Sequence, residues 1–342
     1  MTALRVAVAG PMTSLQDAGR TGFQRYGVSP SGGMDRLALA AANALVGNAP
    51  GAAGIEFMLL GGAFAVEEGD TRVAVMGAAC AVSVDGQSVP PATSVQLRAG
   101  QTITIAPALA GVYAYLAVAG GFALAPDLGS LSLHRRARIG GIGGRPLEAG
   151  DRLPLNLDRP AEAADLALDP VGLDPDAPVR VVLGPQDDHF TADGLTTFAA
   201  STYTVTQEAD RMGYRLAGPR IAHAHGYNIV SDGIVSGSVQ VPGSGEPIVM
   251  MADRQTTGGY PKIATVISAD LRVLAQRRPG QIVRFAVIGM RDAQRLARAR
   301  ASAIAAFATA ARPARRASFT SEELLTLNLA GAAVDAFGSE LA

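Results

Sequence analysis

The chain has 342 residues, 48% of them hydrophobic, and a formal net charge of -1 at pH 7. One hydrophobic core rarely serves more than about 250–300 residues, so we expect two domains, each large enough to fold without metals or disulfides. The near-neutral charge argues against a nucleic-acid-binding protein, which would carry a clear basic excess.

The sequence indicates a soluble, cytoplasmic protein. Cys80 is the only cysteine, which excludes an intrachain disulfide and fits a reducing compartment. The first residues contain only a short apolar patch, and Asp17 follows soon after it. This pattern does not match a signal peptide. One long uncharged run, residues 106–126, is long enough to raise the question of a membrane span. Its prolines, glycines and Tyr-x-Tyr alternation favour buried strands and turns instead.

Short strands separated by glycine-rich turns are expected in the first part of the chain. A helix is predicted at residues 34–46, because small apolar residues repeat on one face and Gly47 follows as a stop. Asp85-Gly86 is a tight-turn signal between strands. Strands are expected at residues 64–67, 72–76, 81–84, 95–97, 102–105 and 112–118.

The composition changes after Pro154. Residues 155–178 are rich in aspartate and proline and lack clear periodicity, which is typical of a linker. Beyond this linker, strands are expected at residues 179–183, 203–206, 229–230, 248–251, 264–267 and 282–287.

The C-terminal residues differ from the body of the chain. Residues 291–311 are rich in alanine and arginine and favour a helix. After Pro313, the capping-box pattern at 320–323 predicts a second helix at 324–337. The fold class is therefore predicted as mainly β, with few helices: an N-terminal β domain at 1–154, a linker at 155–178, a C-terminal β domain at 179–290 and a helical tail at 291–342.

Polar residues interrupt the strand pattern at glycines in three places, where backbone freedom exposes side chains. In the first, residues 13–43, Gln16, Asp17 and Arg20 could brace one another, and Asp35 could occupy the first turn of its helix. Glu56 lies nearby within an apolar strand, so it requires an ion pair, hydrogen bonds or a shifted pKa.

The second cluster places two arginines around a glycine-tyrosine turn. Arg211 and Arg215 are four residues apart, and two guanidiniums projected from one turn could clamp a carboxylate or phosphate. The alternative is an interdomain ion pair for one arginine and solvent for the other.

The third cluster is the stretch DRQTTGGYPK at residues 253–262. Its Gly-Gly hinge, flanked by Thr256, Thr257 and Lys262, could offer donors and an ammonium to an anion. The alternative is a hairpin with solvated or paired charges. No Walker A motif occurs in the chain.

The remaining groups of polar residues give only weak evidence for a functional site. His223 and His225 could supply half a metal site, but no third ligand is suitably spaced, so no metal site is expected. Ser31 and Ser244 lie beside glycines without the pattern of a nucleophile elbow.

Several long motifs in fixed order resemble one family. They are TSLQDAGRTGFQRYGVSPSGGMD, IEFMLLGG, DRMGYRLAGP, GEPIVMMADRQTTGGYPKIATV and AQRRPGQIVRF. The family is called allophanate hydrolase subunit 2, or the KipA-like biotin-dependent carboxyltransferase family. Its stand-alone bacterial members include the C subunit of the ATP-dependent 5-oxoprolinase. The resemblance extends from about residue 5 to about residue 288.

The resemblance implies a fold and a set of partners. It implies tandem cyclophilin-like β-barrel domains and a complex with a KipI-like B subunit together with a LamB/YcsF-like A subunit. This complex opens 5-oxo-L-proline to L-glutamate, with ATP, accompanied by Mg, as co-substrate. The alternatives are a carboxyltransferase-like component of urea or allophanate metabolism, or a non-catalytic regulatory partner of a KipI-like kinase inhibitor. No biotin-attachment motif occurs, so no biotin is expected on this chain.

The resemblance also implies site residues, because the motifs contain the three polar clusters. We expect catalytic roles for Asp253, Lys262 and Arg215. The cations would stabilise charge on the lactam oxygen and the phosphoryl group, and Asp253 would orient a cation or activate water. The expected substrate-binding residues are Arg211, Tyr214, Arg254, Thr256, Thr257, Tyr260 and Gln240. The secondary candidates are Gln16, Asp17, Arg20, Asp35 and Glu56.

Overall fold

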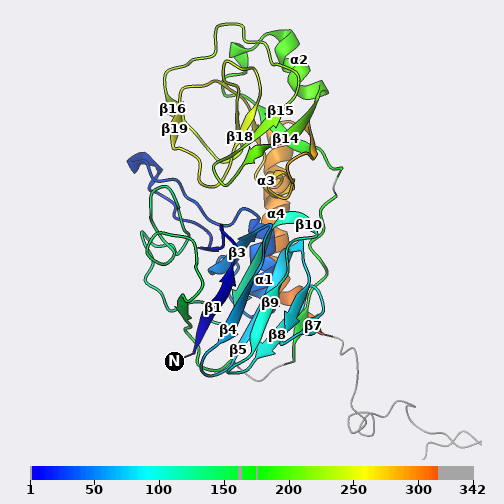
Figure 1. Cartoon of the computed structure of the whole chain (residues 1–342). Coiled ribbons are helices and arrows are strands. Elements are labelled where there is room, and N and C mark those ends of the chain that lie inside the picture. The colour runs from blue at the N-terminus through cyan, green and yellow to red at the C-terminus, as the bar shows by residue number, and fades with distance from the viewer. Residues whose placement is uncertain (1, 161–163, 175, 315–342) are drawn as a thin grey trace, which may run out of the picture.

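The first domain is built from two antiparallel sheets (Figure 1). The computed structural model describes residues 2–160, 164–174 and 176–314. One sheet has the order β11-β1-β4-β9-β6-β7, with β1 (Ala3–Ala9), β4 (Gly62–Val66), β6 (Val82–Val84), β7 (Gln87–Val89), β9 (Thr102–Ile105) and β11 (Arg152–Pro154). The other has the order β2-β3-β10-β5-β8, with β2 (Ser14–Gln16), β3 (Gly54–Met58), β5 (Thr71–Ala79), β8 (Ser94–Leu97) and β10 (Ala110–Val118).

A hydrophobic core lies between these two sheets. Alternate residues of each strand point inward, so that Phe64 and Val66 of one sheet belong to the same buried cluster as Ile55 and Leu116 of the other. The helix α1 (Arg36–Leu45) packs against β5 and β10. It confirms the helix predicted at 34–46, and the Asp35 carboxylate caps it by accepting from the Ala38 amide at 3.1 Å.

The second domain is a closed barrel of seven strands. Its order is β13-β20-β17-β18-β15-β14-β21, and β13 pairs with β21 in parallel. The barrel strands are β13 (Val179–Leu183), β14 (Thr202–Ala209), β15 (Gly213–Ala217), β17 (Ser238–Gln240), β18 (Ile248–Met250), β20 (Lys262–Val266) and β21 (Ile282–Val287). Two short strands, β16 (Asp232–Gly233) and β19 (Thr257–Gly258), form a separate ribbon, and the helical segments are η2 (Asp187–His189), α2 (Ala192–Ala200) and α3 (Leu271–Ala275).

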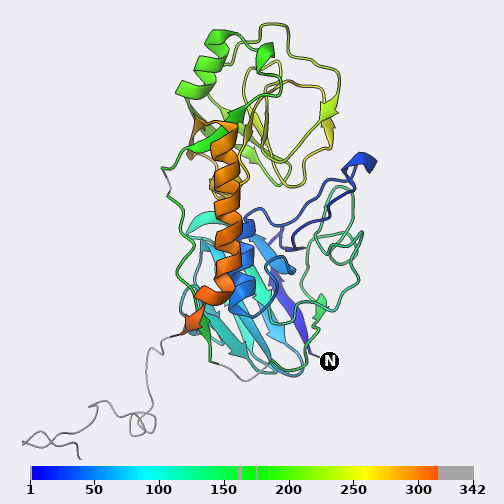
Figure 2. The same cartoon turned by 180° about the vertical axis from the view of Figure 1, so that it is seen from behind.

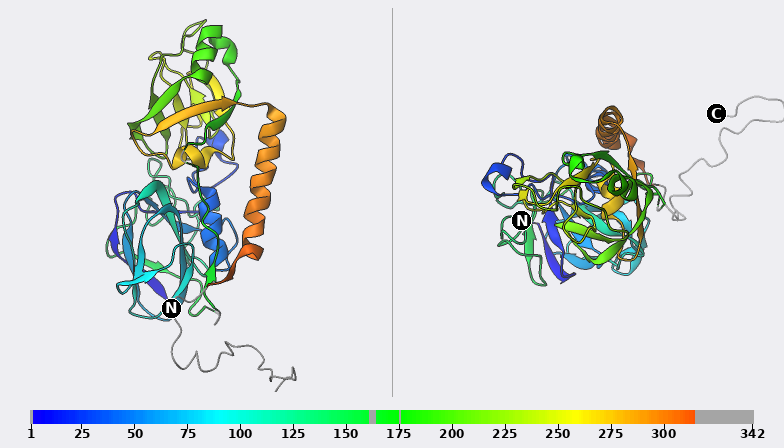
Figure 3. Two further views of the ribbon diagram at one scale, coloured as in Figure 1. Left: turned by 90° about the vertical axis from the view of Figure 1, so that its right-hand side faces the viewer. Right: turned by 90° about the horizontal axis from the view of Figure 1, so that it is seen from above.

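A long helix connects the barrel back to the first domain. α4 (Met290–Ala310) runs along the first domain and packs against α1 (Figures 2 and 3). It leads into β22 (Arg312–Pro313), which pairs with β12 (Leu166–Ala167) of the linker. The helix predicted at 291–311 is confirmed, and its Phe307 packs against the core. The helix predicted at 324–337 lies outside the described residues.

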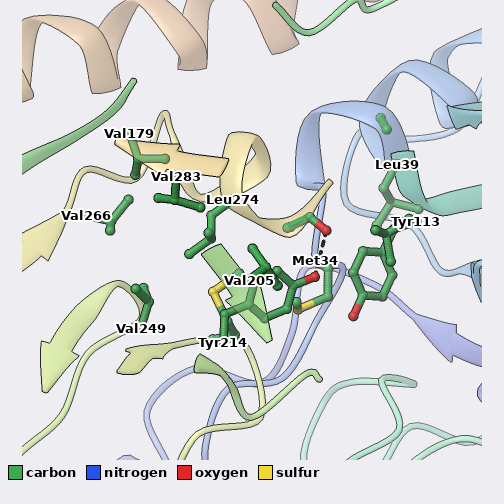
Figure 4. Close-up of a cluster of buried hydrophobic side chains, with 14 of the residues drawn as sticks. Met34, Leu39, Tyr113, Val179, Val205, Tyr214, Val249, Val266, Leu274 and Val283 are labelled. Atoms are coloured by element: carbon green, nitrogen blue, oxygen red, sulfur yellow. Dashed lines mark hydrogen bonds between the residues drawn. The ribbon is translucent and has the colours of Figure 1, made fainter. Parts of the chain in front are cut away.

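The two domains share one continuous core. Met34, Leu39 and Tyr113 of the first domain lie in the same buried cluster as Tyr214 and Leu274 of the second (Figure 4). A shared core of this kind holds the two domains in one relative orientation. Side chains from both domains can therefore build a preformed site where they meet.

The mainly β fold class is confirmed, and the second domain is a closed barrel. Within the described residues, the first domain consists of two separate sheets. Residues 106–126 contain strand β10. None of the described helices is both long and apolar enough to cross a membrane.

Candidate active site between the domains

Arg211 is the centre of a buried polar network between the domains. It lies in the turn between β14 and β15, and only 4% of it is exposed. Its Nε and Nη2 donate to the two carboxylate oxygens of Asp253 at 2.8 and 3.0 Å. From the first domain, Glu56 Oε1 accepts from Nη1 at 2.5 Å. One cation thus joins two carboxylates from different domains.

Two further acceptors complete the surroundings of Arg211. Its Nη2 also lies 3.2 Å from Gln16 Oε1 and 2.8 Å from the Gly32 carbonyl oxygen. Burial by itself would lower the pKa of the guanidinium, but Asp253 and then Glu56 raise this pKa well above its ordinary value. A guanidinium has five N–H groups, so at most one is left for a ligand. Arg211 therefore joins the domains, and the substrate-binding role expected for it does not fit this geometry.

Glu56 is fully hydrogen-bonded inside the protein. Its Oε2 accepts from the Met34 amide at 2.9 Å and from the Tyr115 hydroxyl at 2.7 Å, and that hydroxyl accepts from the Asp35 amide at 2.7 Å. Burial, followed by the charges of Glu56 and Asp35, raises the pKa of Tyr115 well above its usual value. Tyr115 is therefore a neutral donor, and Glu56 has the partners that its apolar strand requires.

Asp35 does more than cap its helix. Its carboxylate accepts from Arg272 Nε at 3.0 and 3.2 Å and from Gln276 Nε2 at 3.1 Å, both of which belong to the second domain. Nearby, the Tyr214 hydroxyl donates to the Ala275 carbonyl at 2.8 Å, and burial raises the pKa of this tyrosine. Tyr214 is thus engaged by the protein, although it was expected to bind substrate.

The remaining residues of the first cluster stabilise a loop of the first domain. Asp17 accepts from the hydroxyls of Ser130 and Ser132, each at 2.6 Å, and from the Leu131 amide. Arg20 Nη2 donates to the Ser132 carbonyl at 2.5 Å. Asp17 and Arg20 therefore brace the loop at 130–132 separately rather than pairing with each other, while Gln16 extends to Arg211.

The clamp expected from Arg211 and Arg215 is not formed. Arg215 is exposed, and its Nε pairs with Glu208 at 2.7 Å on the barrel surface. Arg211 precedes β15 and points into the domain interface, whereas Arg215 belongs to the strand and points to solvent. The alternative interpretation, an interdomain ion pair for one arginine and solvent for the other, is confirmed, and Arg215 lies outside the site in this structure.

Arg254 is also buried, at 3% exposure, but its partners are neutral. Its Nε donates to the Ile234 carbonyl at 3.2 Å, Nη1 to Ser236 Oγ at 2.9 Å and Nη2 to Gln24 Oε1 at 3.1 Å. Gln24 belongs to the short helix η1 (Gln24–Tyr26) of the first domain. Burial, then the positive charge of Arg36, lowers the pKa of Arg254 to about 10.

The second half of the DRQTTGGYPK stretch forms a separate group around the β16–β19 ribbon. Lys262 is buried, and its Nζ donates to Asp232 Oδ2 at 2.7 Å and to the Gly233 carbonyl at 3.2 Å. The hydrogen bond from Lys262, followed by those from the Gly233 amide and Gln186, lowers the pKa of Asp232. The ammonium expected to meet an anionic substrate therefore already has a carboxylate partner.

The other candidates of this stretch surround the same ribbon. Thr257 lies in β19 and is exposed, as is Tyr260, while Thr256 is half-buried. Gln240 is buried and donates from Nε2 to the Tyr260 carbonyl at 3.3 Å. The stretch thus divides: Asp253 and Arg254 contribute to the domain interface, and the residues from 256 to 262 contribute to the ribbon.

Several contributors to the interface were not predicted from the sequence. Gln24 and Tyr115 of the first domain and Arg272 and Gln276 of the second form hydrogen bonds there, and the charge of Arg36 acts on Arg254. Only Tyr115 carried a sequence signal, since its Tyr-x-Tyr alternation places two hydroxyls on one face of a buried strand.

The described residues form no metal cluster, but they line a cavity that borders this interface. Within the part of the chain that the structure describes, no group of three His, Cys, Asp or Glu side chains could hold a metal ion. A cavity of ≈ 670 Å³ lies between the first domain, the linker at 170–174 and α3, and Arg272 and Gln276 of the interface help to line it. Its lining is mostly apolar and includes neither Arg254 nor Lys262.

Known proteins resemble this chain over most of its length. Residues 26–287 match the family described as carboxyltransferase domain, subdomain A and B. The chain is 40% identical to the C subunit of 5-oxoprolinase from Haemophilus influenzae over 285 residues, which is 83% of this chain and 91% of that protein. It is 38% identical to the protein of the same name from Escherichia coli over 293 residues, or 85% and 93% of the two chains.

Solved structures show the same fold. The structure of the protein TTHA0988 matches with a TM-score of 0.76 and 36% identity, over 84% of this chain and 56% of that one. The urea carboxylase of Kluyveromyces lactis matches with a TM-score of 0.82 and 26% identity, over 94% of this chain and 30% of that one. The chain therefore belongs to the family of carboxyltransferase domains, subdomains A and B.

Proposed function

We propose that this chain is the C subunit of a multi-subunit, ATP-dependent 5-oxoprolinase, which opens 5-oxo-L-proline to L-glutamate. The observation that carries the proposal is the extent of the similarity. The match covers 91% and 93% of two proteins named as the C subunit of 5-oxoprolinase, but only 17% and 18% of two proteins named urea amidolyase. The chain thus has the size of the former proteins and corresponds to one part of the latter.

The proposal includes two partner subunits and places the activity in their complex. We assign the partners to the KipI-like B subunit together with the LamB/YcsF-like A subunit, with ATP as co-substrate and no biotin on this chain. The word "subunit" in the names of both relatives supports an assembly. The polar side chains at the domain interface, fixed by a shared core, support a role in positioning.

The chemistry requires activation of a stable amide. In the proposed reaction, the lactam oxygen attacks the γ-phosphorus of ATP, and ADP leaves. Water then adds to the imidate carbon, the C–N bond breaks with proton transfer to nitrogen, and a second water hydrolyses the resulting acyl phosphate to glutamate and phosphate. Negative charge develops on the oxygens at each step, so preorganised cations stabilise the transition states. Because Arg211 and Asp253 pair with each other, we assign them to positioning rather than to proton transfer.

The test is reconstitution of the three subunits. We expect 5-oxoproline-dependent formation of ADP and glutamate only when all three are present, with neither product from this chain alone. Mass spectrometry would measure glutamate, and a coupled assay would measure ADP. Absence of turnover by the full complex, with all three proteins folded, would refute the proposal.

A second candidate function is a carboxyltransferase component acting on urea. The TM-scores of 0.83 and 0.82 to the urea amidolyase and urea carboxylase of Kluyveromyces lactis favour it. This alternative predicts carboxyl transfer to urea from a carboxylated biotin supplied on another chain. Formation of carboxylated urea in that assay, without 5-oxoproline turnover, would select it over the first proposal.

A further inference from the structure

Arg254 is a buried cation without a carboxylate partner. Its three hydrogen bonds go to a carbonyl, a hydroxyl and an amide oxygen, which leaves two of its five N–H groups unused. Among the described residues, no carboxylate forms an ion pair with it, because its neighbour Asp253 turns to Arg211. A buried charge with neutral partners alone is costly, and a counter-ion would offset that cost.

Arg36 is a second guanidinium that has no hydrogen-bonded partner among the described residues, and its charge acts on Arg254. It is the first residue of α1, and it makes no hydrogen bond or ion pair within the described ranges. The residue is accessible to solvent, although many protein atoms surround its guanidinium. The charge of Arg36 is close enough to lower the pKa of Arg254. Desolvation is the main cause that lowers the pKa of Arg36 itself; the charges of Tyr115 and Asp17 partly oppose this shift, and that of Arg211 adds to it. Positive charges thus converge on this side of the interface.

The loop before Arg36 contains buried hydroxyl groups that lack partners. Ser29 and Ser31 are each 1% exposed, and neither Oγ has a hydrogen-bond partner among the described residues. The loop is held at the interface, since the Gly32 carbonyl accepts from Arg211 and the Met34 amide donates to Glu56. Hydroxyl groups and guanidiniums are donors that bind oxyanions in proteins.

We propose that Arg36 and Arg254, together with the Ser29–Ser31 loop, form an oxyanion-binding site at the domain junction. Its ligand is a carboxylate or a phosphoryl group, whose oxygens accept from the unused N–H groups of both arginines. The assignment of that anion to the carboxylate of 5-oxoproline or to a phosphoryl group of ATP rests on the proposed function. The existence of the site itself does not depend on the proposed function.

Binding to the full chain and kinetics of the reconstituted complex test this site. The probes for calorimetry are 5-oxo-L-proline, 2-pyrrolidinone, which is the same lactam without its carboxylate, inorganic phosphate and ATP. If the anion is the substrate carboxylate, 5-oxoproline binds and pyrrolidinone does not. If it is a phosphoryl group, phosphate and ATP bind instead.

Arg36→Gln is the principal variant, because this exposed side chain can change without disturbing the core. We expect it to weaken binding of the selected anion, and to raise the matching KM in the complex, by about tenfold, as for loss of a charge-assisted hydrogen bond. Arg254→Lys keeps the positive charge but loses the planar, forked set of guanidinium N–H donors. It should therefore weaken anion binding by a similar factor. Arg298→Gln, an exposed arginine of α4, is the matched control and should change neither quantity.

The site and the proposed function can fail separately. If the complex turns over 5-oxoproline while Arg36→Gln and Arg254→Lys leave every affinity and KM unchanged, the anion site is refuted and the function stands. If the chain binds phosphate through Arg36 but the complex does not act on 5-oxoproline, the site stands and the function is refuted. Failure of every anion to bind both the chain and the complex also refutes the site.

Discussion

Arg211 and Arg254 are both almost completely buried at the same domain interface, yet the protein surrounds them differently. Arg211 contacts two carboxylates, an amide oxygen and a carbonyl, whereas Arg254 contacts neutral acceptors and lies near Arg36. A buried guanidinium whose counter-ions come from both domains holds the domains together. One that is left with neutral acceptors stays available for a counter-ion from outside the chain. The comparison therefore separates a structural arginine from a candidate binding arginine.

Removing Arg211 should have the largest effect on stability. Arg211→Met would leave Glu56 and Asp253 buried without their cation, and we expect the free energy of unfolding to fall by about 3–5 kcal/mol. Equilibrium denaturation by urea measures it. Arg215→Met, which removes an exposed guanidinium, should change stability by less than about 0.5 kcal/mol. Similar losses in the two variants would contradict the structural role of Arg211.

Removing the Tyr115 hydroxyl should have an intermediate effect on the same network. In Tyr115→Phe, Glu56 loses a donor and the Asp35 amide loses its acceptor, at a cost of about 1–3 kcal/mol in unfolding free energy. The control is Tyr260→Phe, at a tyrosine that is 40% exposed. If this control were the more destabilised of the two in the same denaturation experiment, the network would not contribute as described.

Removing Arg254 should lower the free energy of unfolding by less than removing Arg211. Arg254→Met eliminates a buried charge that no carboxylate of the described chain pairs with, so we expect stability within about 1 kcal/mol of the wild type. The same variant should lose anion binding by calorimetry. A loss of stability as large as that of Arg211→Met would erase the distinction between the two arginines.

The ion pair of Lys262 and Asp232 at the β16–β19 ribbon should make a smaller, pH-dependent contribution to stability. Lys262 lowers the pKa of Asp232 in the folded state. This pair therefore stabilises the fold at pH values above the unfolded-state pKa of the carboxyl group, which is about 4. The contribution is lost as the pH falls through the lowered folded-state pKa. Carboxyl titration by NMR should show the pKa of Asp232 rising toward its ordinary value in Lys262→Met. An unchanged pKa in that variant would mean that other donors cause the shift.

Much of the fold was predictable because its elements are local. The helices at Arg36–Leu45 and Met290–Ala310 follow from apolar periodicity and alanine content, and about half of the described strands follow from alternation between glycine turns. The strand predicted at 229–230 is absent, since these residues lie in a loop and Val230 is 91% exposed. The strand beside it, Asp232–Gly233, forms only because Thr257–Gly258 pairs with it.

The candidate site was predicted as a set of residues rather than as an arrangement. Glu56 in an apolar strand signalled a need for a partner, and that partner is Arg211, 155 residues away in the sequence. Nothing in the local pattern distinguishes Arg211 from Arg215, although one is buried at the interface and the other is in solvent. Arg36 gave no signal, because an arginine at the start of a helix is ordinary.

Both long helices, about half of the strands and the residue types that need partners followed from the sequence, since periodicity, turns and the cost of burying charge act over short distances. Only the tertiary structure decided which charges neutralise one another. Coulomb interactions depend on separation in space, and docking the barrel onto the first domain places Asp253 and Glu56 around Arg211. The same docking leaves Arg254 beside Arg36 without a carboxylate among the residues described, and so defines the candidate site.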